Sequence, residues 1–214
     1  MVEVGIPFSD PLADGPVIQS AGTKALKNGM TLRTLFSQLE QIKGEVHLPL
    51  VLMGYLNPIM HYGIEQFIQR SVEVGVSGAI IPVLPFDDYM KVVKPIADKY
   101  DFRIVMMITP ETSEERIRFI DEHTDGFIYM VSSASITGAQ SQFGDAKQAY
   151  FRHINSMNLQ HPRMIGFGIS NKQTLEAAQQ NAAGAIIGSK FVTLLNETED
   201  ADKALELLSE ALKK

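Results

Sequence analysis

Apolar and polar positions follow two patterns along the chain. Short apolar runs rich in β-branched residues predict buried strands, and the longer stretches between them, with apolar positions at helical spacing, predict amphipathic helices. The predicted strands are Val2–Gly5, Leu48–Tyr55, Gly78–Pro82, Arg103–Ile108, Gly126–Ser132, Met164–Ile169 and Gly184–Ser189. The predicted helices are Leu32–Lys43, Ile64–Val74, Asp87–Tyr100, Ser113–His123, Asp145–Asn158, Asn171–Asn181 and Ala201–Leu212, with Thr31, Ser113 and Asn171 as N-caps.

Each predicted strand is followed by a helix, which is typical of a parallel α/β sheet covered on both faces. Seven such units exceed an ordinary open sheet but are one short of a (β/α)8 TIM barrel. The 214 residues of the chain also fall short of the about 250 that such a barrel typically has. We therefore expect a single TIM-barrel domain over residues 1–214 with seven parallel strands, its first strand and helix missing. A naturally open sheet with two exposed edges is the alternative.

Composition excludes several classes of function. A net charge of −6 without a basic run argues against nucleic-acid binding, and no stretch approaches the roughly 18 apolar residues that span a membrane. We expect a cytoplasmic protein. The absence of cysteine excludes disulfides and thiolate chemistry. The histidines lack the paired spacing of metal ligands, so no metal is expected; they are His47, His61, His123, His153 and His161.

One carboxylate lies inside the first apolar strand. Because burying an unpaired carboxylate is expensive, such a residue either faces water or has a task. If Val2 and Val4 point toward the helices, alternation turns Glu3 and Gly5 into the barrel. Active sites of this fold lie at the carboxyl ends of the strands, where a carboxylate such as Glu3 can act as acid and base.

Further candidates stand in the loops that follow strands. The loop PFSDPLADGP holds Asp10 and Asp14 among three prolines that restrict its conformations, although ordinary turn chemistry explains these residues equally well. Glycines end three strands, in ITGAQ, GFGIS and IIGSK. The last two follow the seventh and eighth strands of a complete barrel, a frequent phosphate site. The segment 132–145 has the small polar composition of an active-site lid, or of a plain connection.

Five stretches of the chain, taken together, resemble the motifs of the α subunit of tryptophan synthase: VEVGIPFSDPLADGPVIQ, LMGYLNP, YMVSSASITGAQ, GFGIS and GAIIGS. They occur in the order of that family, and the resemblance covers essentially the whole chain. It implies a (β/α)8 barrel without a cofactor of its own that cleaves indole-3-glycerol phosphate to indole and glyceraldehyde 3-phosphate. This carbon–carbon lyase would feed the indole to a pyridoxal-phosphate-bearing β subunit in an α2β2 complex of tryptophan biosynthesis.

The resemblance also assigns roles to residues. Glu3 matches the catalytic acid and base, and Asp14 matches a second catalytic carboxylate. Asp10 and Asn57 match positions near the partner interface. The positions that match substrate-binding residues are Tyr55, Tyr129, Thr137, Gly138, Gly166, Phe167, Gly168, Gly188 and Ser189. The two tyrosines match residues that line the pocket, Thr137 matches a lid threonine, and the other six match a phosphate cradle.

The chain departs from the family pattern at two places. Ser133 and Ser135 stand where the family's lid usually has an arginine and a glycine, and Pro82 and Val83 replace a sequence that usually offers an aspartate. Two other functions stay open at this point. One is a catalytically impaired subunit that binds and activates the β subunit without turnover; the other is a phosphate-binding barrel enzyme of different specificity.

Overall fold

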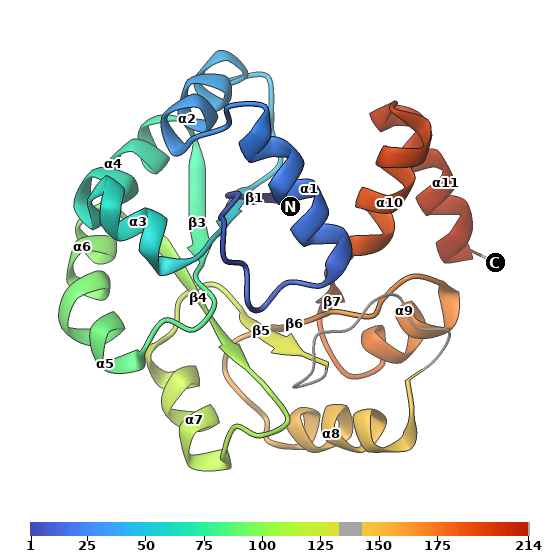
Figure 1. Cartoon of the computed structure of the whole chain (residues 1–214). Helices are drawn as coiled ribbons and strands as arrows, with labels where there is room; N and C mark the ends of the chain where they lie inside the picture. The colour runs from blue at the N-terminus through green and yellow to red at the C-terminus, as the bar shows by residue number, and fades with distance from the viewer. Residues whose placement is uncertain (133–142, 214) are drawn as a thin grey trace. The chain divides into compact units, whose positions relative to one another are not determined.

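A computed structural model describes residues 1–132 and 143–213 of the chain (Figure 1). Gly138 of the predicted cradle and most of the predicted lid, Ser133, Ser135 and Thr137 among it, lie outside the described residues. The strands are β1 (Val2–Gly5), β2 (Leu50–Met53), β3 (Val76–Ile80), β4 (Arg103–Ile108), β5 (Ile128–Val131), β6 (Arg163–Gly166) and β7 (Gly184–Ala185). Their order is the chain order, and every described pairing is parallel, which confirms the predicted seven-stranded parallel α/β arrangement.

The described helices include all those that the pattern predicts and three more. They are α1 (Pro16–Lys27), α2 (Leu32–Gln41), α3 (Leu56–Tyr62), α4 (Ile64–Glu73), α5 (Phe86–Asp88), the π-helical turn η1 (Tyr89–Val93), α6 (Lys94–Lys99), α7 (Glu114–His123), α8 (Asp145–Ser156), α9 (Lys172–Gln179), α10 (Ser189–Thr198) and α11 (Ala201–Lys213). The sequence patterns did not predict α1, α3 and α10. The predicted helix Asp87–Tyr100 is divided into α5, η1 and α6.

The three predicted N-caps are confirmed. The side chains of Thr31, Ser113 and Asn171 accept hydrogen bonds from the backbone N–H of the third residue of α2, α7 and α9, respectively. Asn171 and Thr174 form a reciprocal capping box, in which each side chain accepts from the other residue's backbone. These caps satisfy N–H groups that the helices themselves leave without a partner, so they define where each helix begins.

Five predicted strands extend beyond the observed ones, and the last two do so by the largest margin at their carboxyl ends. The last was expected to run to Ser189, but pairing ends at Ala185 and Ser189 already begins α10. The strand expected over Met164–Ile169 ends at Gly166, because Phe167 has a φ of +67° and leaves the extended conformation. In both places the apolar run continues beyond the point where the backbone turns, so periodicity alone overestimated the strand.

The chain divides into two compact units, and β4 and α1 each contribute residues to both. The first contains Met1–Leu12 and Gly22–Met106. Within it, β1 pairs with β2, β2 with β3, and β3 with β4. Its core contains three buried aromatic side chains, Phe36, Phe67 and Phe102, whose ring centroids are 5.9 and 6.4 Å apart in sequence order. Arg70 of α4 reaches Glu40 of α2 at 2.6 Å, which links these two helices at the surface.

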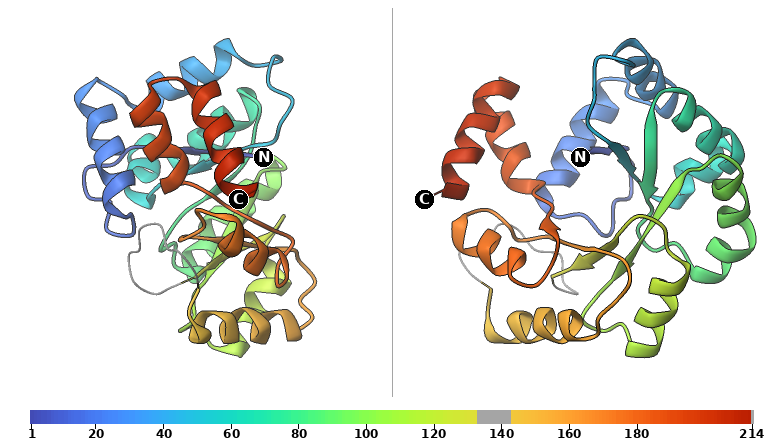
Figure 2. Two further views of the ribbon diagram at one scale, coloured as in Figure 1. Left: turned by 90° about the vertical axis from the view of Figure 1, so that its right-hand side faces the viewer. Right: turned by 180° about the vertical axis from the view of Figure 1, so that it is seen from behind.

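The second unit contains Ala13–Ala21 and Met107–Lys214. Within it, β6 pairs with both β5 and β7, and α10 and α11 run side by side in both views of Figure 2. The carboxylate of Asp121, on α7, is buried and accepts the backbone N–H groups of Gln160 and His161 at 2.7 and 2.9 Å. This bond pair holds the segment that enters β6, whose far end carries the predicted phosphate glycines.

Candidate active site

The first unit carries the predicted proton-transferring residue. Glu3 lies in the middle of β1, in register with Val51 of β2, and its side chain is half-buried with Oε2 out of contact with solvent. Within the described residues, β1 pairs with β2 alone. A carboxylate in such a place is accessible from one side and shielded on the other, which suits a group that both gives and takes protons.

Aromatic side chains lie near this carboxylate in the sequence and at the end of the neighbouring strand. Phe8 follows β1, and its ring centroid is 5.4 Å from that of Tyr55, which follows β2. Both side chains are half-buried. Tyr55 is also the N-cap residue of α3, and its side chain makes no capping hydrogen bond to the helix. This pair offers an apolar wall that a planar ring can stack against.

The residues predicted to lie near a partner are at the surface of the first unit. Asp10 and Asn57 are both exposed. Each has an exposed apolar side chain close by in the sequence: Leu12 is 83% exposed and Met60 is 58% exposed. Large apolar side chains at such exposure are unremarkable one at a time, but here they accompany the two predicted contact residues.

The second unit carries the other predicted carboxylate, Asp14. It is half-buried and stands two residues before α1, whose first residue is Pro16. Gln19 donates from Nε2 to the Asp14 carbonyl at 2.8 Å and from its backbone N–H to the Gly15 carbonyl at 3.0 Å. The start of α1 therefore holds the backbone of Asp14, with proline in the helix position that needs no N–H donor.

The side chain of Tyr129, on β5, lies beside Gly166, the last residue of β6. Tyr129 is buried, and a Cβ atom added to Gly166 would lie 2.1 Å from its hydroxyl oxygen. Only glycine fits at position 166 while the tyrosine ring keeps this position. The ring of Tyr129 also contacts that of Phe167, with centroids 6.0 Å apart. The structure thus brings together three of the predicted substrate-binding residues.

The backbone after β6 has an unusual conformation. Phe167 and Gly168 have φ angles of +67° and +80°, so two successive residues are left-handed. Ser132, at the end of β5, is fully buried and makes two bonds here: its N–H donates to the Gly166 carbonyl at 3.2 Å and its hydroxyl to the Phe167 carbonyl at 2.8 Å. From the sequence, Ser132 was expected only as the last residue of a predicted strand and the first of the predicted lid segment; its one signal was a small polar residue at the end of an apolar run.

The other predicted cradle residues stand at the start of α10. Gly188 is the N-cap of this helix without a side-chain bond, and Ser189 is its first residue. Ser189 therefore lies inside the helix and does not cap it. The first N–H groups of a helix have no partner within the helix and carry its positive dipole end, so they are suited to an anion.

Burial changes the ionisation of two residues on α8. Burial raises the pKa of Tyr150 well above its ordinary value of 10.0 and lowers that of Lys147 below 10.5. The Lys147 ammonium lies 5.7 Å from the centroid of the Phe143 ring. Neither residue was predicted to belong to the site. Burial in both cases disfavours the charged form, so it favours the neutral phenol of Tyr150 and the neutral amine of Lys147.

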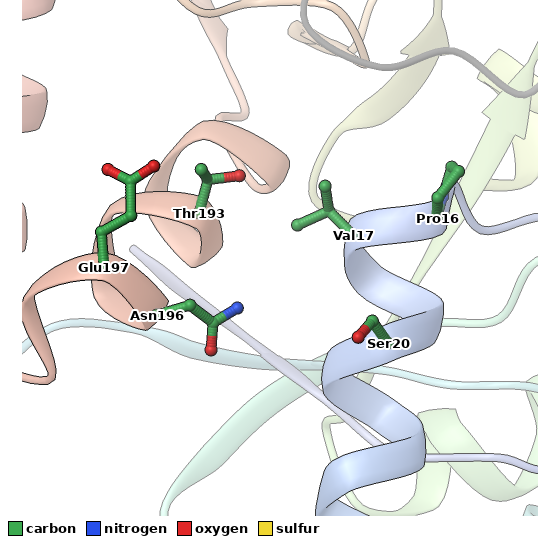
Figure 3. A pocket seen from close by; sticks show the side chains of 6 residues that line it. All are labelled: Pro16, Val17, Ser20, Thr193, Asn196 and Glu197. Atoms are coloured by element: carbon green, nitrogen blue, oxygen red, sulfur yellow. The ribbon is translucent and has the colours of Figure 1, made fainter.

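A cavity of about 370 Å³ lies in the second unit, between the first turns of α1 and the side of α10 (Figure 3). Pro16, Val17 and Ser20 face it from α1, and Thr193, Asn196 and Glu197 face it from α10. None of these is a predicted site residue, and the cavity holds a single carboxylate. Ser20, Thr193, Asn196 and Glu197 give it polar side chains, but the predicted site residues lie elsewhere.

Two properties of the described residues bear on membrane spanning and on metal binding. In residues 1–132 and 143–213, no helix combines the length and apolar character needed to cross a membrane. Over the same residues, no three acidic or histidine side chains come together as a metal site would require.

Comparisons with known proteins place these residues in a family context. The chain matches the family model described as tryptophan synthase alpha chain over residues 1–214. It is 68% identical to the tryptophan synthase alpha chain of Phocaeicola vulgatus and 64% identical to that of Parabacteroides distasonis, and it covers 83% of each of them with 100% of its own length.

Solved structures give the same result. A mutant tryptophan synthase alpha-subunit from Pyrococcus furiosus is 32% identical with a TM-score of 0.86, over 98% of this chain and 84% of that one. Subunit alpha from Legionella pneumophila is 32% identical with a TM-score of 0.83, over 98% of this chain and 78% of that one. These likenesses confirm the predicted fold class, a TIM barrel with seven of its strands present.

Proposed function

The chain belongs to the tryptophan synthase alpha chain family, and from this premise we propose that it cleaves indole-3-glycerol phosphate to indole and glyceraldehyde 3-phosphate. The observation that carries the proposal is the family match over all 214 residues, with 68% identity to the Phocaeicola vulgatus protein. The chain is thus a carbon–carbon lyase of tryptophan biosynthesis.

Glu3 transfers the protons in this proposal. The reaction breaks the bond between carbon 3 of the indole ring and the first side-chain carbon. Carbon 3 gains a proton, and the hydroxyl on that side-chain carbon loses one as the carbon becomes an aldehyde. One carboxyl group can give the first proton and take the second, so the reaction balances without another acid. The half-buried position of Glu3, with Oε2 shielded, supports this role.

Asp14 stabilises the charge that forms during the reaction. Protonation of carbon 3 spreads positive charge to the indole nitrogen, and a carboxylate that accepts a hydrogen bond from this N–H is most favourable when the charge is greatest. The backbone of Asp14 is held by Gln19 at the start of α1, which supports a fixed rather than a mobile partner. Tyr55, Tyr129 and Phe167 offer rings to the indole.

The phosphate of the substrate binds to backbone N–H groups of the second unit. Gly168 stands in the left-handed turn after β6, and Gly188 and Ser189 stand at the N-terminus of α10. Gly138, Gly166 and Phe167 complete the proposed set; Gly138 lies outside the described residues. Neutral backbone donors at a helix N-terminus bind a phosphate without a lysine or arginine.

We further propose that the chain acts with a tryptophan synthase β subunit in an α2β2 heterotetramer. The β subunit, which holds pyridoxal phosphate, receives the indole, and the α chain needs no cofactor because proton transfer alone completes its reaction. Asp10 and Asn57 lie near the contact, accompanied by exposed Leu12 and Met60, which would be covered by the partner. The cytoplasm is the proposed compartment.

The test is an assay of the purified chain with indole-3-glycerol phosphate, with and without a β subunit. We expect equimolar release of indole and glyceraldehyde 3-phosphate, and a higher rate with the partner present. Stimulation of the β subunit without any indole release would contradict the catalytic proposal and favour a subunit that only activates its partner. Cleavage of a different phosphate ester without indole would indicate another specificity.

A further inference from the structure

We propose that Ser132 is a positioning residue for the phosphate loop: its hydroxyl holds the Phe167 carbonyl, and this keeps the Gly168 N–H directed at the phosphate. The inference rests on the proposed function, because it takes the Gly166–Gly168 segment as part of the phosphate cradle. It adds a residue that touches neither substrate nor reacting atoms but acts through the backbone of its neighbour.

The backbone conformation of Phe167 needs contacts that keep it in place. A φ of +67° is uncommon for any residue with a side chain and is a clear outlier for a bulky one. Glycine adopts it at little cost, but Phe167 does not, so other contacts must keep the residue there. Two contacts are present: the ring of Phe167 packs on that of Tyr129, and its carbonyl accepts the Ser132 hydroxyl at 2.8 Å.

The bond from Ser132 also sets the direction of the Gly168 N–H. The carbonyl and the N–H of one trans peptide point to opposite sides of the chain. When Ser132 holds the carbonyl of the peptide between Phe167 and Gly168, it also sets the Gly168 N–H on the side away from β5. In the part of the chain that the structure describes, this N–H donates to no backbone carbonyl. It is therefore available to an anion on that side.

The hydroxyl bond of Ser132 lies outside the pairing of β5 with β6. The register of β5 and β6 ends at the pair Val131 and Gly166, and the Ser132 N–H extends it by one bond to the Gly166 carbonyl. The hydroxyl bond lies one residue further, beyond the paired strands. Removal of the hydroxyl leaves all these backbone bonds available, so the strands should keep their pairing while the Phe167–Gly168 peptide gains freedom to rotate.

The chain offers a matched control. Ser71, on α4 of the first unit, is also fully buried, and its hydroxyl donates to the Phe67 carbonyl at 2.7 Å. Ser71→Ala and Ser132→Ala therefore remove the same group, from the same degree of burial, with the same type of partner. They differ in place, because Ser71 lies within a helix and none of the proposed site residues belongs to that helix.

The experiment measures binding of inorganic phosphate to the full chain by isothermal titration, with the unfolding midpoint measured in parallel. Ser132→Ala should bind phosphate about five- to tenfold more weakly than the wild type, the effect of one lost hydrogen bond. Ser71→Ala should bind phosphate like the wild type at a similar loss of stability. With indole-3-glycerol phosphate, Ser132→Ala should raise KM and change kcat little, because the phosphate contact is equal in ground and transition states.

Ser132→Cys keeps the size of the side chain nearly unchanged with a weaker donor. It should give an intermediate affinity, and it provides the test if Ser132→Ala does not fold. Unchanged phosphate affinity in the folded Ser132 variants, or an equal loss in Ser71→Ala, would overturn the inference and leave the proposed function intact. A wild-type chain that cleaves the substrate but binds no phosphate would overturn the cradle itself, and this inference with it.

Discussion

The strand that carries the proposed acid–base residue and the strands that carry the proposed phosphate loop are built very differently. Among residues 1–132 and 143–213, β1 pairs with β2 only, its ends are exposed, and a Cβ added to its last residue, Gly5, would meet no atom within 4 Å. At the ends of β5 and β6, Ser132 is fully buried and a Cβ on Gly166 would collide with Tyr129. One region is loosely surrounded, and the other is tightly specified.

This difference in packing suits the two proposed tasks, which are proton transfer by Glu3 on β1 and phosphate binding at the ends of β5 and β6. A phosphate is held best by donors that are already in place, since any freedom must be lost on binding. A carboxyl that exchanges protons between two atoms of a substrate needs room to move between them. We therefore expect substitutions near β6 to act through stability and binding, and substitutions on β1 to act through the rate of the chemical step.

The largest expected effect comes from Glu3→Gln. The amide keeps the size of the side chain but can neither give nor take the proton, so indole release should fall by about 10²- to 10⁴-fold. Phosphate affinity and the unfolding midpoint should stay near those of the wild type. Glu45→Gln, at an exposed position of the first unit, is the control. Normal indole production by Glu3→Gln would refute its role.

The next largest effect is expected on the free energy of unfolding when alanine replaces either of two glycines that each end a strand. Gly166→Ala places a Cβ 2.1 Å from the Tyr129 hydroxyl oxygen, and the overpacking should lower the free energy of unfolding by about 1–3 kcal/mol. Gly5→Ala, with no neighbour within 4 Å, should change it by less than about 0.5 kcal/mol. Urea denaturation of both variants measures the difference. Equal effects would mean that Tyr129 moves aside easily.

A smaller effect distinguishes the two units by their helix caps. Asn171→Ala removes the cap of α9 and should lower the free energy of unfolding by about 1 kcal/mol, as should Thr31→Ala at α2. Because α9 starts shortly after Gly168, only Asn171→Ala should also weaken phosphate binding. Denaturation and phosphate titration of both variants test this. A loss of phosphate affinity in Thr31→Ala would show that the caps do not act locally.

The smallest expected effect is that of the surface ion pair of the first unit. The hydrogen bond and the charge of Arg70 lower the pKa of Glu40 below its ordinary value of 4.5. A depressed carboxyl pKa stabilises the fold fully above pH 4.5 and loses its contribution as the pH falls through the folded-state pKa. Arg70→Gln should therefore reduce the unfolding midpoint slightly at pH 6, and the difference from the wild type should shrink toward pH 3. A constant difference would assign the effect to packing instead.

Most elements of the fold could be predicted from local patterns. The strands Val2–Gly5 and Arg103–Ile108 have the predicted bounds, and the three N-caps act as predicted. The helix α1 was missed although Pro16 after Gly15 is a recognisable start signal. The helix α10 was missed because the apolar run of β7 continues into it, and periodicity does not show where pairing stops.

The candidate site, like the fold, could be predicted from the sequence only in part. Motifs pointed to Glu3, Asp14 and the glycines, because residue types and their order along the chain carry that information. The reason that position 166 must be glycine, the left-handed turn at Phe167 and the part played by Ser132 came only from the tertiary structure. Ser132 and Phe167 are 35 residues apart, and a pattern read over a few neighbouring residues cannot show which backbone carbonyl a distant hydroxyl reaches. Sequence determined which groups are available; the pairing of β5 with β6 decided which of them meet.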